Sequence, residues 1–126
     1  MKNILAIGFL LSGTTIPPKE ISKITGIVPD TELMRGERNA QLDLPRLNIW
    51  SIMSQASSDD VAEHWASLEP MLKGAKEEIK EIAKTGQAKL TLIITSKRRI
   101  PPITIPPSMS EFAGFINAVI DIDHMQ

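Results

Sequence analysis

The most concentrated group of side chains that could do chemistry lies near the end of the sequence, where Asp121, Asp123 and His124 occur close together. Alternate side chains of a strand point to one face, so the two carboxylates would share a face and the histidine would lie opposite. Two carboxylates could contact a hard cation, but calcium and magnesium sites need more oxygen ligands than these. We therefore interpret the pair as the solvent-facing side of a last strand and predict no metal site.

A second group is basic, because Lys97, Arg98 and Arg99 are consecutive and Arg35 and Arg38 could extend them into a patch. The few aromatic residues, two Trp and three Phe, leave little for stacking on bases. The formal net charge of −1 gives the chain no field that would gather nucleic acid or an anionic membrane. We interpret the basic run as a solvated strand end. As a binding patch it would suit an acidic protein partner better than nucleic acid.

Motifs of catalysis are absent from the sequence. It has no cysteine, which excludes thiolate nucleophiles and disulfides, and it contains neither GxSxG nor HExxH. One of the two histidines, His64, lies at the boundary of an apolar helical stripe, which indicates a half-buried structural residue. The segment from Gly8 to Thr15 imitates the glycine spacing of a phosphate loop but lacks its lysine. We predict no catalytic or cofactor-binding residue.

Residues 58–86 contain the strongest structural signal, because apolar residues recur there at spacings of four and three. This spacing aligns them in one stripe of an α-helix, with charged residues on the other faces. We predict one long amphipathic helix that follows the capping segment Ser57 to Asp60, ends at Gly86, and has a kink or a break near Pro70. The stripe consists of Val61, Trp65, Leu68, Leu72, Ala75, Ile79 and Ile82.

Strands and short helices are predicted on either side of this helix. Pro17 and Gly26 mark the two ends of one short helix, and a capping box at Ser108 begins another that ends at Asn117. The order β-α-β-β-α-β, then an extended piece, a short helix and one more strand, is the ferredoxin-like order with a C-terminal addition. We expect a single α+β domain, residues 1–126, with a mostly antiparallel sheet covered by the long helix. The predicted strands span residues 4–11, 32–35, 47–55, 88–96 and 118–124.

The apolar run from Ile4 to Leu11 follows Lys2 and has two interpretations. A positive start and an apolar stretch are features of a signal peptide, but no small-x-small cleavage site follows. The run is too short to span a membrane and fits a buried strand that ends at Gly13. We favour the strand, and with it a cytoplasmic location, which the absence of cysteine also suits.

The segment from Ile100 to Pro107, IPPITIPP, contains four prolines and is therefore not a central strand. We expect an extended or polyproline-like conformation for it. In the interpretation that we favour, it protects a sheet edge by withholding N–H donors. In the other, it forms an exposed rim for a partner.

Several segments, taken in order, resemble one family. A first strand that ends in glycine is followed by TIPPKEISKITGIVPD, by RGE, by a strand with WS, by LEPMLKGAKEEI and by AVIDID. Together they are similar to the uncharacterised bacterial domain-of-unknown-function family 4279, from about Ile4 to His124. The chain departs from that pattern at His124, where family members often have an aromatic residue. The resemblance implies a compact bacterial α+β domain and no particular activity.

These observations favour a non-enzymatic bacterial protein-interaction domain of the immunity or accessory type, without a cofactor. Two alternatives stay open: a small-molecule-binding or enzymatic domain with a pocket between sheet and helices, and a structural homodimer without a ligand. A ligand site requires several charged groups to converge in one pocket. We expect neither nucleic acid nor a membrane as partner. The candidate partner or ligand surface comprises Arg35, Lys97, Arg98, Arg99, Asp121 and Asp123.

Overall fold

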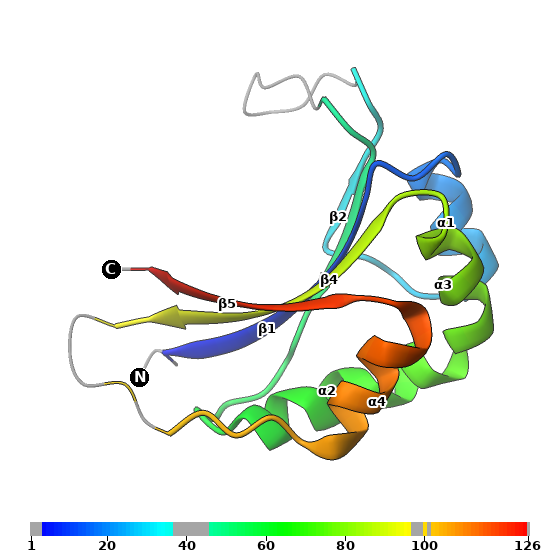
Figure 1. Ribbon diagram of the computed structural model, residues 1–126. Coiled ribbons are helices and arrows are strands. Elements are labelled where there is room, and N and C mark those ends of the chain that lie inside the picture. The colour runs from blue at the N-terminus through cyan, green and yellow to red at the C-terminus, as the bar shows by residue number, and fades with distance from the viewer. Residues whose placement is uncertain (1–3, 37–45, 97–99, 101, 126) are drawn as a thin grey trace.

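The computed structural model describes residues 4–36, 46–96, 100 and 102–125, and a five-stranded mixed sheet is its centre (Figure 1). The strands are β1 (Leu5–Ser12), β2 (Thr31–Leu33), β3 (Ile49–Met53), β4 (Gln87–Thr95) and β5 (Val119–Met125). They lie in the order β2-β3-β1-β4-β5. The pairings of β1 with β3, β1 with β4 and β2 with β3 are antiparallel, whereas β4 and β5 are parallel. The apolar run near the start of the sequence thus forms the central strand.

Four helices in the described part of the chain lie on one side of this sheet (Figure 1). They are α1 (Pro18–Thr25), α2 (Val61–Gly74), α3 (Lys76–Ala83) and α4 (Pro107–Ile116). The protein is therefore an α+β structure in which helices cover one sheet face, as the sequence predicted. Within the ranges described, no helix has the length and apolar character needed to cross a membrane.

The predicted apolar stripe is buried throughout, but it belongs to two helices and not to one. α2 ends at Gly74, Ala75 has a φ of −120° and a ψ of 22°, and α3 begins at Lys76. The prediction of a single long helix is therefore wrong, and the break that the sequence left open near Pro70 lies instead at Ala75. Pro70 lies inside α2 without ending it. The helix ends instead at Gly74, and glycine has the lowest helix propensity of all residues except proline. There the Ala75 N–H bonds back to the Leu72 carbonyl over 3.3 Å, which tightens the last turn.

The core lies between the helices and the covered face of the sheet. Alternate residues of the central strands point toward the helices, and in β1 these are Leu5, Ile7, Phe9 and Leu11. Three aromatic rings cross this layer in edge-to-face contacts, because the ring centre of Phe9 lies 6.4 Å from that of Trp50 and 6.1 Å from that of Phe112. The stripe of α2 and α3 completes the layer.

Most helix ends follow the predicted local signals. Gly26 ends α1 with a φ of 72°, Asn117 ends α4 with a φ of 60°, and Asp60 caps α2 by accepting the Ala62 N–H at 3.1 Å. The predicted capping box at Ser108 is wrong, because α4 begins one residue earlier and has no side-chain cap. The Ser108 hydroxyl instead accepts a hydrogen bond of 2.9 Å from the indole N–H of Trp65.

The proline-rich segment before α4 does not lie at the sheet edge. β5 occupies that edge, while Ile100, Ile103 and Ile105 pack against the core. The segment and α4 together form the crossover that two parallel neighbouring strands require. The interpretation of this segment as an edge protector is therefore wrong, because its apolar side chains cover the core beside Ile94 and Leu5.

Candidate functional site

The sheet face that points away from the helices, the open face, is formed by the strand residues that alternate with the buried ones. No described helix lies on it (Figure 1). Its centre contains Leu10, Ser51, Met53, Thr91 and Ile93, all of which are partly exposed. Its outer margin on β5 contains Val119, Asp121, Asp123 and Met125, all of which are exposed.

A small apolar area occupies the middle of the open face, over Gly8 of β1. A Cβ atom placed on Gly8 would lie 3.1 Å from the Met53 sulfur and 3.8 Å from the Ile93 Cδ1. These two side chains, one from β3 and one from β4, therefore close over the central strand. Thr91 and Ser51, which lie next to them in the register, make the surroundings polar. The open face therefore combines a small apolar centre with polar neighbours.

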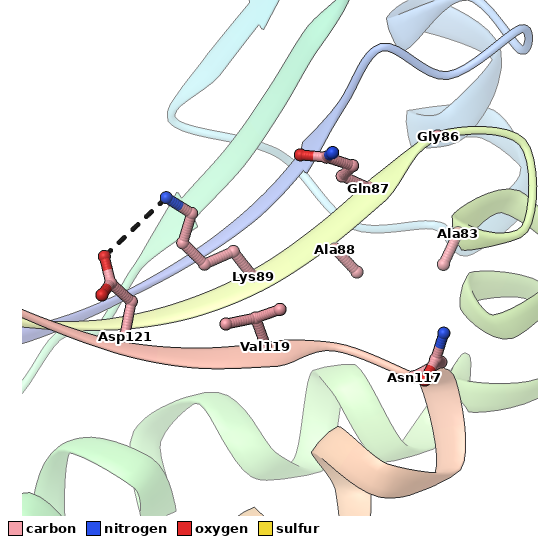
Figure 2. Close-up of a pocket in the computed structure, with 8 residues that line it drawn as sticks. All are labelled: Ala83, Gly86, Gln87, Ala88, Lys89, Asn117, Val119 and Asp121. Atoms are coloured by element: carbon pink, nitrogen blue, oxygen red, sulfur yellow. Dashed lines mark ion pairs between the residues drawn. The ribbon is translucent and has the colours of Figure 1, made fainter.

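Asp121 and Asp123 lie side by side on the open face, as strand alternation predicted, at the outermost strand of the sheet. The ammonium of Lys89 on β4 lies 3.8 Å from an oxygen of Asp121, and both side chains are about half exposed at 43% and 50% (Figure 2). Exposed ion pairs of this kind contribute little to stability. Asp123 has no ion pair within the described residues. His124 lies on the other side of the strand, with its Nε2 2.9 Å from the Ser96 carbonyl.

A notch of about 470 Å³ lies where β4 and β5 separate, because β4 begins before its pairing with β5 does. Figure 2 shows its wall, which includes Gln87 and Lys89 from β4, Asp121 from β5 and Asn117 from the end of α4. Its polar groups are two amides and one ion pair. Such groups can donate and accept hydrogen bonds, but the notch has no nucleophile with an adjacent base.

The charged residues that the sequence singled out do not converge. Arg35 follows β2, at one edge of the sheet, whereas Asp121 and Asp123 lie on β5 at the opposite edge. Arg35 is exposed, and its backbone N–H donates to the Asn48 side chain at 2.8 Å. Lys97 to Arg99, like Arg38, lie outside the described residues. Among the residues with described positions, the condition for a ligand site is therefore not met.

His64 has a structural role and is more deeply buried than predicted, with 2% of its surface exposed. Its Nε2 lies 2.6 Å from the Ser58 carbonyl, which can only accept, so Nε2 carries a proton. In the neutral ring, Nδ1 then accepts the Ser54 hydroxyl proton at 2.6 Å, and the Ser54 oxygen accepts the Ile7 N–H at 2.9 Å. This chain of hydrogen bonds joins β1 to the start of α2 and occupies both ring nitrogens.

Glu69 on α2 is partly buried, although charged residues of this segment were expected on the solvent-facing sides of the helix. The Lys73 ammonium lies 3.1 Å from one of its carboxylate oxygens. Lys73 lowers the pKa of the Glu69 carboxyl against the opposing effect of burial, and Ser108 and Trp65 also lower it. Because Ser108 belongs to α4, the Glu69 carboxylate lies where α2 and α4 meet. No local pattern around Glu69 could have indicated this position.

An α+β domain with one covered face and one open face is the class that these features define. Within the described ranges, no three histidine or acidic side chains lie together in a way that could hold a metal ion. The chain belongs to the DUF4279 family, a domain of unknown function, because the family model matches residues 5–126. This match confirms the resemblance seen in the sequence. No curated protein and no solved structure matches the chain.

Proposed function

We propose that this chain is a non-enzymatic protein-interaction domain, of the immunity or accessory type in a bacterium, that binds its partner through the open face. The observation that carries the proposal is the contrast between the two sides of the sheet. The four helices of the described ranges pack on one side, whereas the other side keeps apolar and polar side chains in contact with solvent. A sheet face without a covering layer is accessible to another protein, and its mixed composition is compatible with a non-obligate interface.

Charge indicates what kind of protein would bind. The open-face margin on β5 has two carboxylates, Asp121 and Asp123, and only Asp121 has a cationic neighbour, Lys89, among the described residues. The margin is therefore net negative, and Val119 and Met125 beside it are 63% and 50% exposed. A partner with both basic and apolar side chains is complementary to this surface.

The ligand-binding alternative has weaker support. The notch offers about 470 Å³ but only one ion pair and two amides, and Arg35 lies at the far edge of the sheet. A homodimer that joins two β5 strands is disfavoured by its charges. Antiparallel pairing about Ile122 would set the Asp121 carboxylate of one copy against the Asp123 carboxylate of the other.

A charge-matched pair of variants tests the proposal. Thr91→Arg adds a large cation to the middle of the open face, and Ala66→Arg adds the same side chain to the exposed surface of α2. Both are tagged and expressed in the native bacterium, and the protein that co-purifies is identified, purified and titrated by calorimetry. We expect one defined partner whose affinity is at least about tenfold lower for Thr91→Arg, equivalent to about 1.4 kcal/mol, and unchanged for Ala66→Arg. Equal binding by both variants, with equal melting temperatures, contradicts the proposal.

The finer classification of the fold belongs to the same proposal. We propose that β1 to β4, with α1 to α3, form a ferredoxin-like unit to which α4 and β5 are added. The strand order β2-β3-β1-β4 and the antiparallel pairing of its neighbours support this reading. An experimental structure with a different order of these four strands would contradict it.

A further inference from the structure

The outer side of β5 is a regular strand edge without a neighbour in the described part of the chain. β5 pairs with β4 in an unbroken parallel register from Val119 to Met125. β5 is the last strand in the order, so no described strand pairs with its other side. A regular edge of this length can accept another strand by main-chain hydrogen bonds.

The hydrogen bonds to β4 show which backbone groups point outward. The Met125 carbonyl accepts the Ser96 N–H at 3.2 Å, so the backbone of Met125 is directed toward β4. Successive residues of a strand direct their N–H and C=O groups to alternate sides. The backbone groups of Ile120, Ile122 and His124 are therefore directed away from the sheet.

Apart from the charges of Asp121 and Asp123, this edge lacks the devices by which proteins commonly prevent strand addition. β5 contains no proline, glycine, lysine or arginine, and its register shows no bulge. Pro102 of the neighbouring segment lies near Leu5 and Ile94, whose side chains point to the covered side. Ile120 and Ile122 are β-branched, which suits a strand, and Ile122 is 52% exposed.

The side chains of β5 limit which strand can pair there. Asp121 and Asp123 project on the open face, two residues apart, and Ile122 projects between them on the other face. A strand laid along this edge brings its own side chains opposite these three. Cations at two alternate positions would neutralise the carboxylates, and an apolar residue between them would cover Ile122. Another β5 strand would instead bring carboxylates together.

We propose that the β5 edge binds an extended segment of a partner protein in which two Lys or Arg residues flank one apolar residue. The inference rests on the proposed function, because it names the segment by which the partner is recognised. The segment adds a sixth strand to the sheet and forms its main-chain hydrogen bonds with Ile120, Ile122 and His124. Specificity comes from Asp121 and Asp123.

Synthetic peptides test the inference without the native partner. The probe is a capped peptide of about ten residues in which Arg and Val alternate, with binding to the full chain followed by fluorescence anisotropy. We expect binding that weakens at least about tenfold when Glu replaces Arg in the peptide, and again when its alternate backbone nitrogens are methylated. In hydrogen exchange, the peptide should slow the amides of Ile122 and His124. Unchanged binding by the methylated peptide, or no binding by any peptide, overturns the inference.

Matched variants of the protein separate recognition at this edge from general attraction to a cationic peptide. Asp121→Asn combined with Asp123→Asn removes two charges from the edge, and Glu77→Gln combined with Glu78→Gln removes two from α3. We expect the first pair to weaken peptide binding at least about tenfold and the second to leave it nearly unchanged. Equal loss in both pairs means general electrostatic attraction and overturns the inference.

A proline at the edge separates this inference from the proposed function. Ile122→Pro removes an N–H that points away from β4, so it should leave the sheet folded, as a melting temperature near that of the wild type would verify. We expect it to abolish binding of both the peptide and the native partner. If Thr91→Arg prevents partner binding but Ile122→Pro does not, the open face binds the partner and the edge inference falls. If light scattering shows that the wild type is a dimer and that Ile122→Pro is a monomer, the β5 edge binds a second copy of this chain, and the inference is overturned.

Discussion

Leu10 and Leu11 are neighbours of the same type on β1, and they show how different the two faces of the sheet are. Leu11 points toward the helices and is fully buried, whereas Leu10 points to the open face and stays partly exposed. The same alternation holds in β3 and β4, whose covered-side residues are at most 6% exposed. The side chains of the covered face stabilise the fold, whereas substitutions on the open face should change the free energy of unfolding little. The open face can therefore contain the residues that a binding partner requires without a loss of stability.

The largest expected effect uses these two leucines. Leu11→Ala should lower the free energy of unfolding by about 2–5 kcal/mol, because it leaves a cavity in a packed layer. Leu10→Ala should cost less than about 1 kcal/mol, because Leu10 is partly hydrated already. Urea denaturation of both variants measures the difference. Equal losses would mean that the open face is covered, which contradicts the proposed function.

A second comparison concerns two glycines. A Cβ atom on Gly86 would collide with the carbonyl of Ser12 and lie 2.7 Å from the Thr14 nitrogen, whereas one on Gly74 meets nothing within 4 Å. Gly86→Ala should therefore cost about 1–3 kcal/mol or more, since the crowding atoms belong to the backbone. Gly74→Ala should be neutral or stabilise by up to about 1 kcal/mol. A stable Gly86→Ala protein in thermal denaturation would show that the turn after β1 can move.

A third prediction concerns the buried polar chain on the covered side. Ser54→Ala leaves the Ile7 N–H without its acceptor and His64 without its hydroxyl donor, so we expect a loss of about 1–3 kcal/mol. Ser57→Ala, at an exposed position nearby, should change stability by less than about 0.5 kcal/mol. Denaturant titration measures both. If the two variants lose the same unfolding free energy, water must reach the Ile7 N–H and the His64 ring in place of the Ser54 hydroxyl, which contradicts the prediction.

The smallest expected effect is a dependence on pH at Glu69. Its folded-state pKa lies below the ordinary value of 4.5, so its contribution is present above pH 4.5 and is lost as pH falls through the lowered folded-state pKa. Glu69 is 27% exposed, so we expect less than about 1 kcal/mol. The difference in unfolding free energy between the wild type and Glu69→Gln should shrink on acidification. A difference that stays constant from pH 7 to pH 3 would contradict the ion pair.

Features with local causes were predictable from the sequence. The stripe of α2 and α3 follows from spacing alone, and the ends at Gly26, Asp60 and Asn117 follow from the chemistry of single residues. Features with distant causes were not. Ser108 has the pattern of a capping residue, yet its hydroxyl binds the Trp65 indole from another helix. The break at Ala75 has no strong local signal beyond Gly74.

The candidate site was predictable only in part for the same reason. Alternation correctly put Asp121 and Asp123 on one face of a strand. Their position on the outermost strand depends on the parallel pairing of β5 with β4, which no local pattern indicates. The open face itself follows from where the described helices lie, so only the assembled sheet reveals it.

The central position of β1 has a consequence for how the chain folds. β1 pairs with β3 and β4, and its contact from Leu5 to Ile94 joins distant parts of the sequence. Closing such long loops slows folding, so we expect refolding in milliseconds to seconds and not in microseconds. During synthesis, β1 leaves the ribosome long before β4 exists. Until then, the edge of β1 that pairs with β4 has no partner strand, so we expect the incomplete chain to be more prone to aggregation than the folded protein.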